Sequence, residues 1–207
     1  MMYTQRITLA ITGASGIQYS MRLLQCLLKA RRQVYVIFSK PAQVVAGLET
    51  DLNLPAQTGA IEQHLAERYQ AGAGQLQVFS QEQWTAPIAS GSGVADAMVV
   101  CPCSTGTLAA IANGSCDNLI QRAADVSIKE QKKLILLPRE MPFSEIHLRN
   151  MHSLARIGVV IMPPNPGFYN RPTTMQELID FVVARVLDQL SIEHELMPRW
   201  GLDQQDN

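Results

Sequence analysis

The chain has 207 residues, of which 47% are hydrophobic and 17% charged, and its formal net charge is -1. This length and composition predict one globular domain over 1–207 with a full apolar core, and we expect residues 203–207 at the end to be frayed. A net charge so close to zero argues against partners held by charge, namely nucleic acid and membrane surfaces. No apolar run is long enough to span a bilayer, and the low charge leaves surface for a homo-oligomer.

The spacing of cysteine and histidine argues against metal and redox chemistry. Cys26, Cys101, Cys103 and Cys116 form neither a CxxC pair nor a paired metal-ligand motif. The histidines have no partner at i,i+4 and no cysteine neighbour, so no metal site is expected. We therefore expect reduced thiols that behave as small apolar side chains in a cytoplasmic protein.

Short apolar runs alternate with helical patterns along the whole chain. Strands are expected at 7–12, 33–38, 75–79, 94–101, 133–137 and 159–162, with Pro102 ending the fourth. Helices are expected at 18–30, from Pro41 to Glu49, and at 61–69, 108–113, 119–130, 144–157 and 174–190. This alternation predicts the α/β class, specifically a Rossmann-like (flavodoxin-like) three-layer sandwich with a central, mostly parallel sheet.

The chemically distinctive residues follow the ends of these strands, where sheets of this kind bind ligands. They are Gly13–Ser15, Ser39, Ser104–Thr107, Arg139–Glu140 and Tyr169. Two of these segments, Gly13–Ser15 and Ser104–Thr107, place glycine and hydroxyl residues where a strand ends and a helix begins. Such a helix start favours the binding of a phosphate. Neither segment is a GxGxxG or a P-loop motif, and each alone fits an ordinary turn. Together they favour a nucleotide cofactor.

Two groups of basic residues allow both a functional and an ordinary interpretation. Arg185 shares a helix face with Leu178 and Phe181, so its guanidinium calls for an anion. Alternatively its stem crosses the edge of the core, or it pairs with a neighbouring subunit. Arg122 and Lys129 lie two turns apart and, with Arg139, either clamp a second phosphate or form a solvated basic face.

Single acidic and aromatic residues are equally open to two interpretations. Glu49 and Glu140 are either proton carriers or solvated carboxylates near turns. Trp84, Tyr169 and Trp200 lie in or near loops, where they form an aromatic wall or pack at an interface.

Six motifs, taken in order, resemble UbiX-type flavin prenyltransferases over nearly the whole chain. They are ITGASG at 11–16, SGS at 90–92, CPCSTGTLAAIANG at 101–114, DNLIQRAADVSIK at 117–129, PREMP at 138–142 and PPNPGFY at 163–169. The related flavin-dependent cysteine decarboxylases are similar in fold. They carry an Ala-Ser-Ala-Asn-Thr type of loop and a catalytic histidine, where this chain has Ser104–Thr107 and Glu49.

The resemblance implies a metal-independent transferase that joins the dimethylallyl group of dimethylallyl phosphate to N5 and C6 of reduced FMN. The product, prenylated FMN, would serve a separate UbiD-type decarboxylase. The implied FMN-binding residues are Gly13, Ala14, Ser15, Ser39, Ser104, Thr105, Gly106, Thr107 and Arg139. The implied residues for the allylic substrate are Ser90, Gly91, Arg122, Lys129, Tyr169 and Arg185, with Trp84 and Trp200 facing the allylic cation.

The resemblance also implies roles in catalysis and assembly. Glu140 and the leaving phosphate would form the acid–base pair, Ser15 and Glu49 would arrange protons near N5, and Lys129 would stabilise the departing phosphate. Relatives form dodecamers with sites at subunit junctions, so some of these groups would act across subunits. Two rival hypotheses remain, a flavin-dependent decarboxylase and a carrier that only delivers FMN.

Overall fold

A six-stranded parallel sheet forms the centre of the molecule, seen in the computed structural model, which describes residues 3–198. The strands, in chain order, are β1 (Arg6–Ile11), β2 (Gln33–Phe38), β3 (Leu76–Phe79), β4 (Ala97–Cys103), β5 (Lys133–Pro138) and β6 (Val160–Ile161). Their spatial order is β3-β2-β1-β4-β5-β6. The first three strands are added outward from β1 to β3, and the next three are added on the other side of β1, from β4 to β6. Ligands of such sheets bind at the carboxyl ends of the strands beside this switch point, between β1 and β4.

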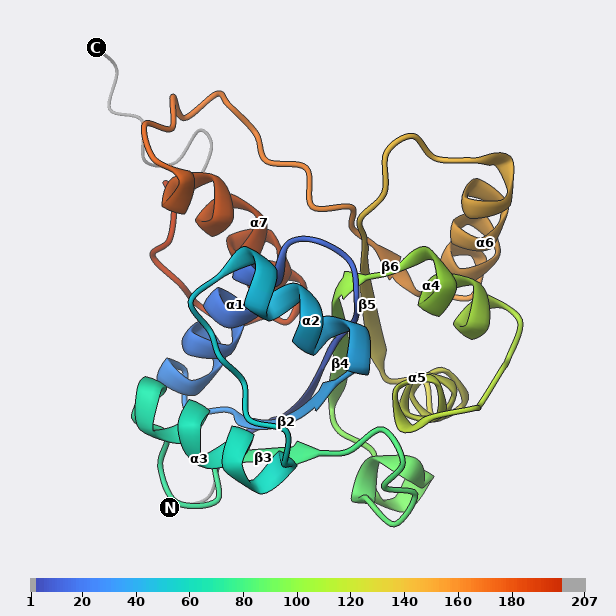
Figure 1. The fold of residues 1–207 in the computed structure, drawn as a ribbon. Helices are drawn as coiled ribbons and strands as arrows, with labels where there is room; N and C mark the ends of the chain where they lie inside the picture. Colours follow the sequence, from blue (N-terminus) through green and yellow to red (C-terminus); the bar gives the residue numbers. More distant parts are fainter. Residues whose placement is uncertain (1–2, 199–207) are drawn as a thin grey trace.

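Helices cover both faces of the sheet, which confirms the predicted three-layer sandwich (Figure 1). One layer holds α1 (Ile17–Lys29), α2 (Lys40–Glu49), α3 (Thr58–Tyr69) and α7 (Met175–Gln189). The other holds α4 (Thr105–Ala112), α5 (Leu119–Lys129), α6 (Glu145–Arg156) and the short turns η1 (Pro87–Ala89) and η2 (Gly91–Gly93). Successive strand residues, such as Leu9 and Ala10, enter opposite apolar cores. None of the helices within residues 3–198 is long and apolar enough to cross a membrane.

β4 continues past the point at which the sequence predicted its end. Pro102 was expected to break the strand, yet β4 runs on to Cys103, with a cis peptide bond between Cys101 and Pro102. A proline lacks an N–H group, but its carbonyl oxygen can still accept. The Pro102 oxygen accepts a hydrogen bond from the backbone N–H of Thr12 at 3.3 Å, so β4 stays joined to the chain leaving β1. The strand therefore delivers Ser104 to the edge of the sheet.

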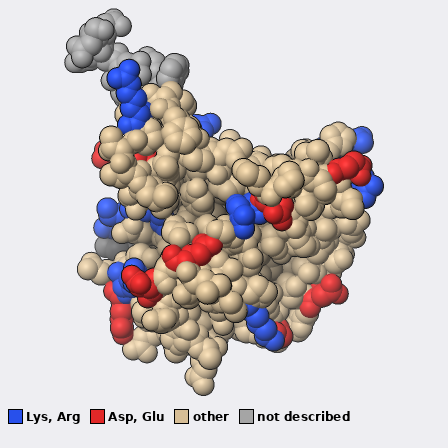
Figure 2. Space-filling model, turned by 45° about the horizontal axis from the view of Figure 1, so that its top comes forward, with Lys and Arg blue, Asp and Glu red and all other residues tan. Residues whose placement is uncertain are grey.

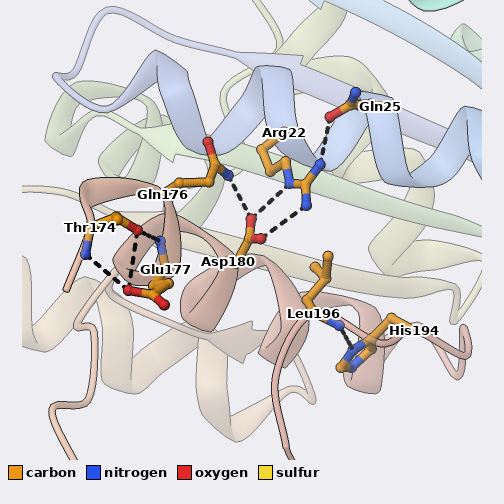
Figure 3. Close-up of polar contacts among 8 residues, drawn as sticks. All are labelled: Arg22, Gln25, Thr174, Gln176, Glu177, Asp180, His194 and Leu196. Atoms are coloured by element: carbon orange, nitrogen blue, oxygen red, sulfur yellow. Dashed lines mark hydrogen bonds and ion pairs between the residues drawn. The ribbon is translucent and has the colours of Figure 1, made fainter. Parts of the chain in front are cut away.

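An ion pair joins α1 to α7 (Figure 3). Arg22 donates from Nε to Oδ1 of Asp180 at 2.7 Å and from Nη2 to Oδ2 at 2.9 Å. Gln176 also donates to Oδ1 of Asp180, at 2.7 Å. The two charged side chains are only 23% and 14% exposed, and the hydrogen bond that Arg22 donates to Asp180 raises the pKa of Arg22. This two-pronged pair fixes how the two helices lie against each other.

Side-chain hydrogen bonds hold the start of α7 and the segment that follows the helix. At its start, Thr174 accepts from the N–H of Glu177 at 3.3 Å, and the Glu177 carboxylate accepts from the N–H of Thr174 at 2.9 Å. Bonds from the backbone N–H groups of Thr173 and Thr174 hold the pKa of Glu177 below its usual value. Beyond the other end, His194 accepts from the N–H of Leu196 at 3.4 Å.

Candidate active site

One threonine ties the carboxyl ends of β1 and β4 together. The Thr12 hydroxyl donates to the Pro102 oxygen at 2.8 Å and accepts from the Ser104 N–H at 2.8 Å. Ser104 then caps α4, because its Oγ accepts from the N–H of Thr107 at 3.3 Å. Within residues 3–198 the next two N–H groups, of Thr105 and Gly106, have no acceptor. This helix start therefore has the unpaired donors that the anion site predicted from the sequence requires.

The start of α1 does not offer a second open anion site, and this corrects the expectation from the sequence. The Glu49 carboxylate fills it: Oε2 accepts from the N–H of Gly16 at 2.9 Å and of Ile17 at 3.4 Å. A carboxylate at a helix N-terminus satisfies unpaired N–H groups and the positive end of the dipole, as a phosphate would. Glu49 thus comes to lie beside the loop that carries the exposed Ser15. Ser15 and Glu49, which the sequence analysis paired, therefore lie close together.

The loops after β1 and β2 are packed against each other. A Cβ atom on Gly13 would lie 2.3 Å from the Cβ of Pro41, so this close approach requires glycine. Ser39 donates its N–H to Ile11 at 2.9 Å and caps α2 by accepting from the N–H of Ala42 at 3.1 Å. Its hydroxyl proton remains available to a ligand.

Arg139 and Glu140 follow β5 at the same edge. The Arg139 N–H donates to the Cys103 oxygen at 3.2 Å, which places Arg139 next to the end of β4. Both side chains are exposed and line a cavity of about 380 Å³. The other lining residues are Pro138, Met141, Pro142, Phe143, Pro163, Pro164 and Asn165. The cavity wall thus presents a cation and a carboxylate beside the α4 anion site.

A second cluster forms around α5 and includes four of the residues predicted to bind the allylic phosphate. A Cβ atom on Gly91 would lie 2.1 Å from Oε1 of Glu130 and 3.0 Å from Nζ of Lys129, and these two charged groups form an ion pair. Arg122 donates from Nε to the carbonyl that precedes Ser90, at 3.0 Å. We call these four residues, Ser90, Gly91, Arg122 and Lys129, the α5 cluster.

Within one copy of the chain, Lys129 of the α5 cluster lies away from the carboxyl edge of the sheet. Lys129 ends α5 just before β5 begins at Lys133, so it lies toward the amino edge. Arg139 follows the opposite end of β5. From the sequence, Arg122, Lys129 and Arg139 were expected to bind the same phosphate. In a single copy Lys129 and Arg139 lie at opposite ends of β5, so the three cannot bind one phosphate there.

Arg185 is not buried on an apolar face, contrary to the expectation from the sequence. Its side chain is 50% exposed, and Nη1 donates to Oδ2 of Asp188 at 2.5 Å. Oδ1 of Asp188 lies 3.2 Å from Nε2 of His194, whose side chain is only 7% exposed. The buried stripe of α7 runs through Val182 and Val186 instead. The sequence analysis overlooked Asp188, which lies three residues beyond Arg185 and meets it on the helix surface.

The aromatic residues expected to line the substrate lie apart from one another. The Tyr169 ring packs edge-on against Phe181 of α7, with 5.6 Å between centroids, one turn before Arg185. Trp84 is exposed in the turn that follows β3. Trp200 and the segment expected to be frayed, 203–207, lie outside the described residues.

Comparison with known proteins identifies the family. A family model described as Flavoprotein matches residues 1–187. The flavin prenyltransferase UbiX of Pseudomonas aeruginosa is 55% identical over 197 residues, covering 95% of this chain and 94% of that protein. The chain belongs to the UbiX-type flavin prenyltransferases. This confirms the resemblance drawn from the six motifs.

Two solved structures of UbiX-type proteins share this fold. One is a UbiX in complex with FMN and dimethylallyl pyrophosphate, with a TM-score of 0.84 and 39% identity, covering 95% of this chain and 97% of that one. The other is a dodecameric FMN-dependent UbiX-like decarboxylase from Escherichia coli O157:H7, with a TM-score of 0.83 and 40% identity, covering 94% and 98%.

Proposed function

We propose that this UbiX-type protein transfers the dimethylallyl group of dimethylallyl phosphate to N5 and C6 of reduced FMN. The observation that carries the proposal is the open start of α4, where Ser104 caps the helix and the N–H groups of Thr105 and Gly106 are left for an anion, at the sheet edge that also carries Ser15 and Glu49. If the phosphate of FMN binds at the start of α4, the flavin lies at the same sheet edge as the Glu49 carboxylate. The prenylated FMN then serves a UbiD-type decarboxylase.

The residues at this edge fit FMN in charge and in hydrogen-bonding capacity. Thr105, Gly106 and Arg139 supply donors for its phosphate, and the free proton of Ser39 supplies another. Within residues 3–198 the Glu49 carboxylate is held through Oε2 alone, so its second oxygen is left for a ligand beside Ser15. Glu140 lies on the wall of the adjoining cavity and serves as the acid–base partner of the leaving phosphate.

We further propose that the site for the allylic phosphate is completed by other copies of the chain in a homo-oligomer, a dodecamer. Lys129 of the α5 cluster would add a second cation to Arg139 at the carboxyl edge of a neighbouring copy. Charged side chains are sparse on the face shown in Figure 2, which leaves uncharged surface for such contacts. Exposed apolar side chains surround the carboxyl edge: Val44, Leu48, Met141, Phe168 and Met175. The four cysteines are unpaired thiols, which supports a cytoplasmic location.

In the decisive experiment the purified protein is incubated with reduced FMN and dimethylallyl phosphate after exhaustive chelation of metals. The mass of the flavin is then measured by mass spectrometry. We expect the flavin to gain one dimethylallyl unit without added metal, because Arg and Lys groups stabilise the leaving phosphate. The diphosphate serves as a parallel donor. Bound but unaltered FMN with both donors would support the carrier hypothesis. Turnover that appears only with added Mg²⁺ would contradict metal independence, and release of CO₂ from a peptidyl cysteine would favour the decarboxylase.

Replacing Arg185 by alanine is expected to weaken binding of dimethylallyl phosphate while leaving FMN affinity unchanged. The lost charge-assisted contact corresponds to about 1.5–3 kcal/mol, or roughly 10- to 100-fold in affinity. Arg185→Lys should recover only part of this, because the planar two-pronged donor is missing. Titration of both ligands tests the prediction, with Arg149→Ala on exposed α6 as the matched control. Equal losses for the two ligands would assign Arg185 a structural role.

A further inference from the structure

The Thr12 hydroxyl occupies a gap in the hydrogen bonding between β1 and β4. Regular pairing of these strands ends at Ala10 with Val100, and on the other side of β4 the register against β5 shifts between Val100 and Cys103. Pro102 has no N–H to continue the ladder. Thr12, only 2% exposed, replaces the missing bonds by donating to the Pro102 oxygen and accepting from the Ser104 N–H, each at 2.8 Å.

Ser104 is the residue whose position decides where α4 begins. Its N–H is held by Thr12, and its own hydroxyl accepts from the N–H of Thr107. The open N–H groups of Thr105 and Gly106 follow directly from this cap. A chain of two hydroxyls therefore connects the end of β1 with the anion site on α4, and the same threonine precedes the Gly13–Ser15 loop.

We propose that Thr12 is a positioning residue for the phosphate of FMN, acting through Ser104. The inference rests on the FMN binding proposed above. Hydrogen bonds from N–H groups to an anion depend steeply on distance and angle, so a small shift of the cap costs affinity. Without the hydroxyl, the Ser104 N–H would lose its acceptor while the Pro102 oxygen would keep only the Thr12 backbone N–H, and the start of α4 would move to give the Ser104 N–H a new partner.

The test compares Thr12→Val, which keeps the shape of the side chain but removes the hydroxyl, with Thr12→Ser, which keeps both bonds. Ser20→Ala is the matched control. Ser20 is 0% exposed and donates to the Cys101 oxygen, next to Pro102, but does not contact Ser104. Affinity of the apoprotein is measured by quenching of FMN and riboflavin fluorescence, and stability by urea unfolding. Riboflavin lacks the phosphate and so reports on the rest of the site.

We expect Thr12→Val to weaken FMN binding roughly 10- to 100-fold and riboflavin binding little, with Thr12→Ser and Ser20→Ala near wild type. Equal losses for FMN and riboflavin, or an equal FMN loss in Ser20→Ala, would overturn the proposal. Wild type that binds riboflavin and FMN equally, or neither, would overturn the assignment of the FMN phosphate to α4 itself. Thr12→Ala removes the same hydroxyl and repeats the measurement if Thr12→Val does not fold.

Discussion

Replacing Asp180 by alanine is expected to lower the free energy of unfolding by about 3 kcal/mol. The change leaves the Arg22 guanidinium without its carboxylate in a position that is only 23% exposed. A charge stranded in this way loses its partner without regaining full hydration. Gln176 loses an acceptor as well. Urea unfolding followed by circular dichroism measures the effect.

Two further variants separate the ion pair from general surface effects. Glu145→Ala removes the partner of Arg149, a pair of 4.0 Å between largely exposed side chains, and should cost under about 0.5 kcal/mol. Arg22→Met in the Asp180→Ala background removes the stranded charge and should restore part of the stability. If Asp180→Ala were no more costly than Glu145→Ala, the contact between α1 and α7 would contribute little to the fold.

Alkaline pH is expected to destabilise the protein through two buried thiols. Burial raises the pKa of Cys101 to about 12 and raises that of Cys103 still further. In the unfolded chain both thiols titrate near 9.0. Above that pH the unfolded state releases protons that the folded state retains, so stability is complete below pH 9 and falls as pH rises toward the folded pKa values. Each thiol should cost about 1.4 kcal/mol per pH unit over this window.

The measurement is the free energy of unfolding between pH 8 and pH 10, a range chosen around these values, for wild type, Cys103→Ala and Cys116→Ala. Cys116 is exposed and serves as the control. The cavity left by Cys103→Ala lowers stability at every pH, so the informative quantity is the loss of stability between pH 8 and pH 10, which should be smaller than in wild type by about 1.4 kcal/mol in total, or about 0.7 kcal/mol per pH unit on average. The slope of Cys116→Ala should match that of wild type. Identical slopes for all three proteins would contradict the prediction.

Most of the fold followed from the sequence because parallel strands buried on both faces are nearly continuous apolar runs. Such runs, at 33–38 for example, predicted β2 with its observed bounds. The carboxyl edge followed as well, since residues that directly succeed parallel strands must meet at one edge. The sequence therefore predicted that Gly13–Ser15 and Ser104–Thr107 lie at the same edge of the sheet.

Contacts between distant residues could not be predicted in this way. Glu49 lies 33 positions from Gly16, and no local pattern indicates that it occupies the start of α1. The signal for Thr12 was equally weak, because a threonine at the end of a strand is common. The prediction that Pro102 ends β4 was wrong because a proline lacks the N–H donor but keeps a carbonyl oxygen that can still accept. For Arg185 the signal was present, in Asp188 at i+3.

The separation of Lys129 in the α5 cluster from the carboxyl edge has a genetic consequence if the two meet only between copies. A variant defective in Lys129 and another defective in Ser15 would each, alone, build no intact site. In a cell that makes both, mixed assemblies would bring the sound α5 cluster of one chain to the sound edge of the other. Two recessive mutations within a single gene would then complement each other, because the functional unit for this activity is the assembly and not the single chain.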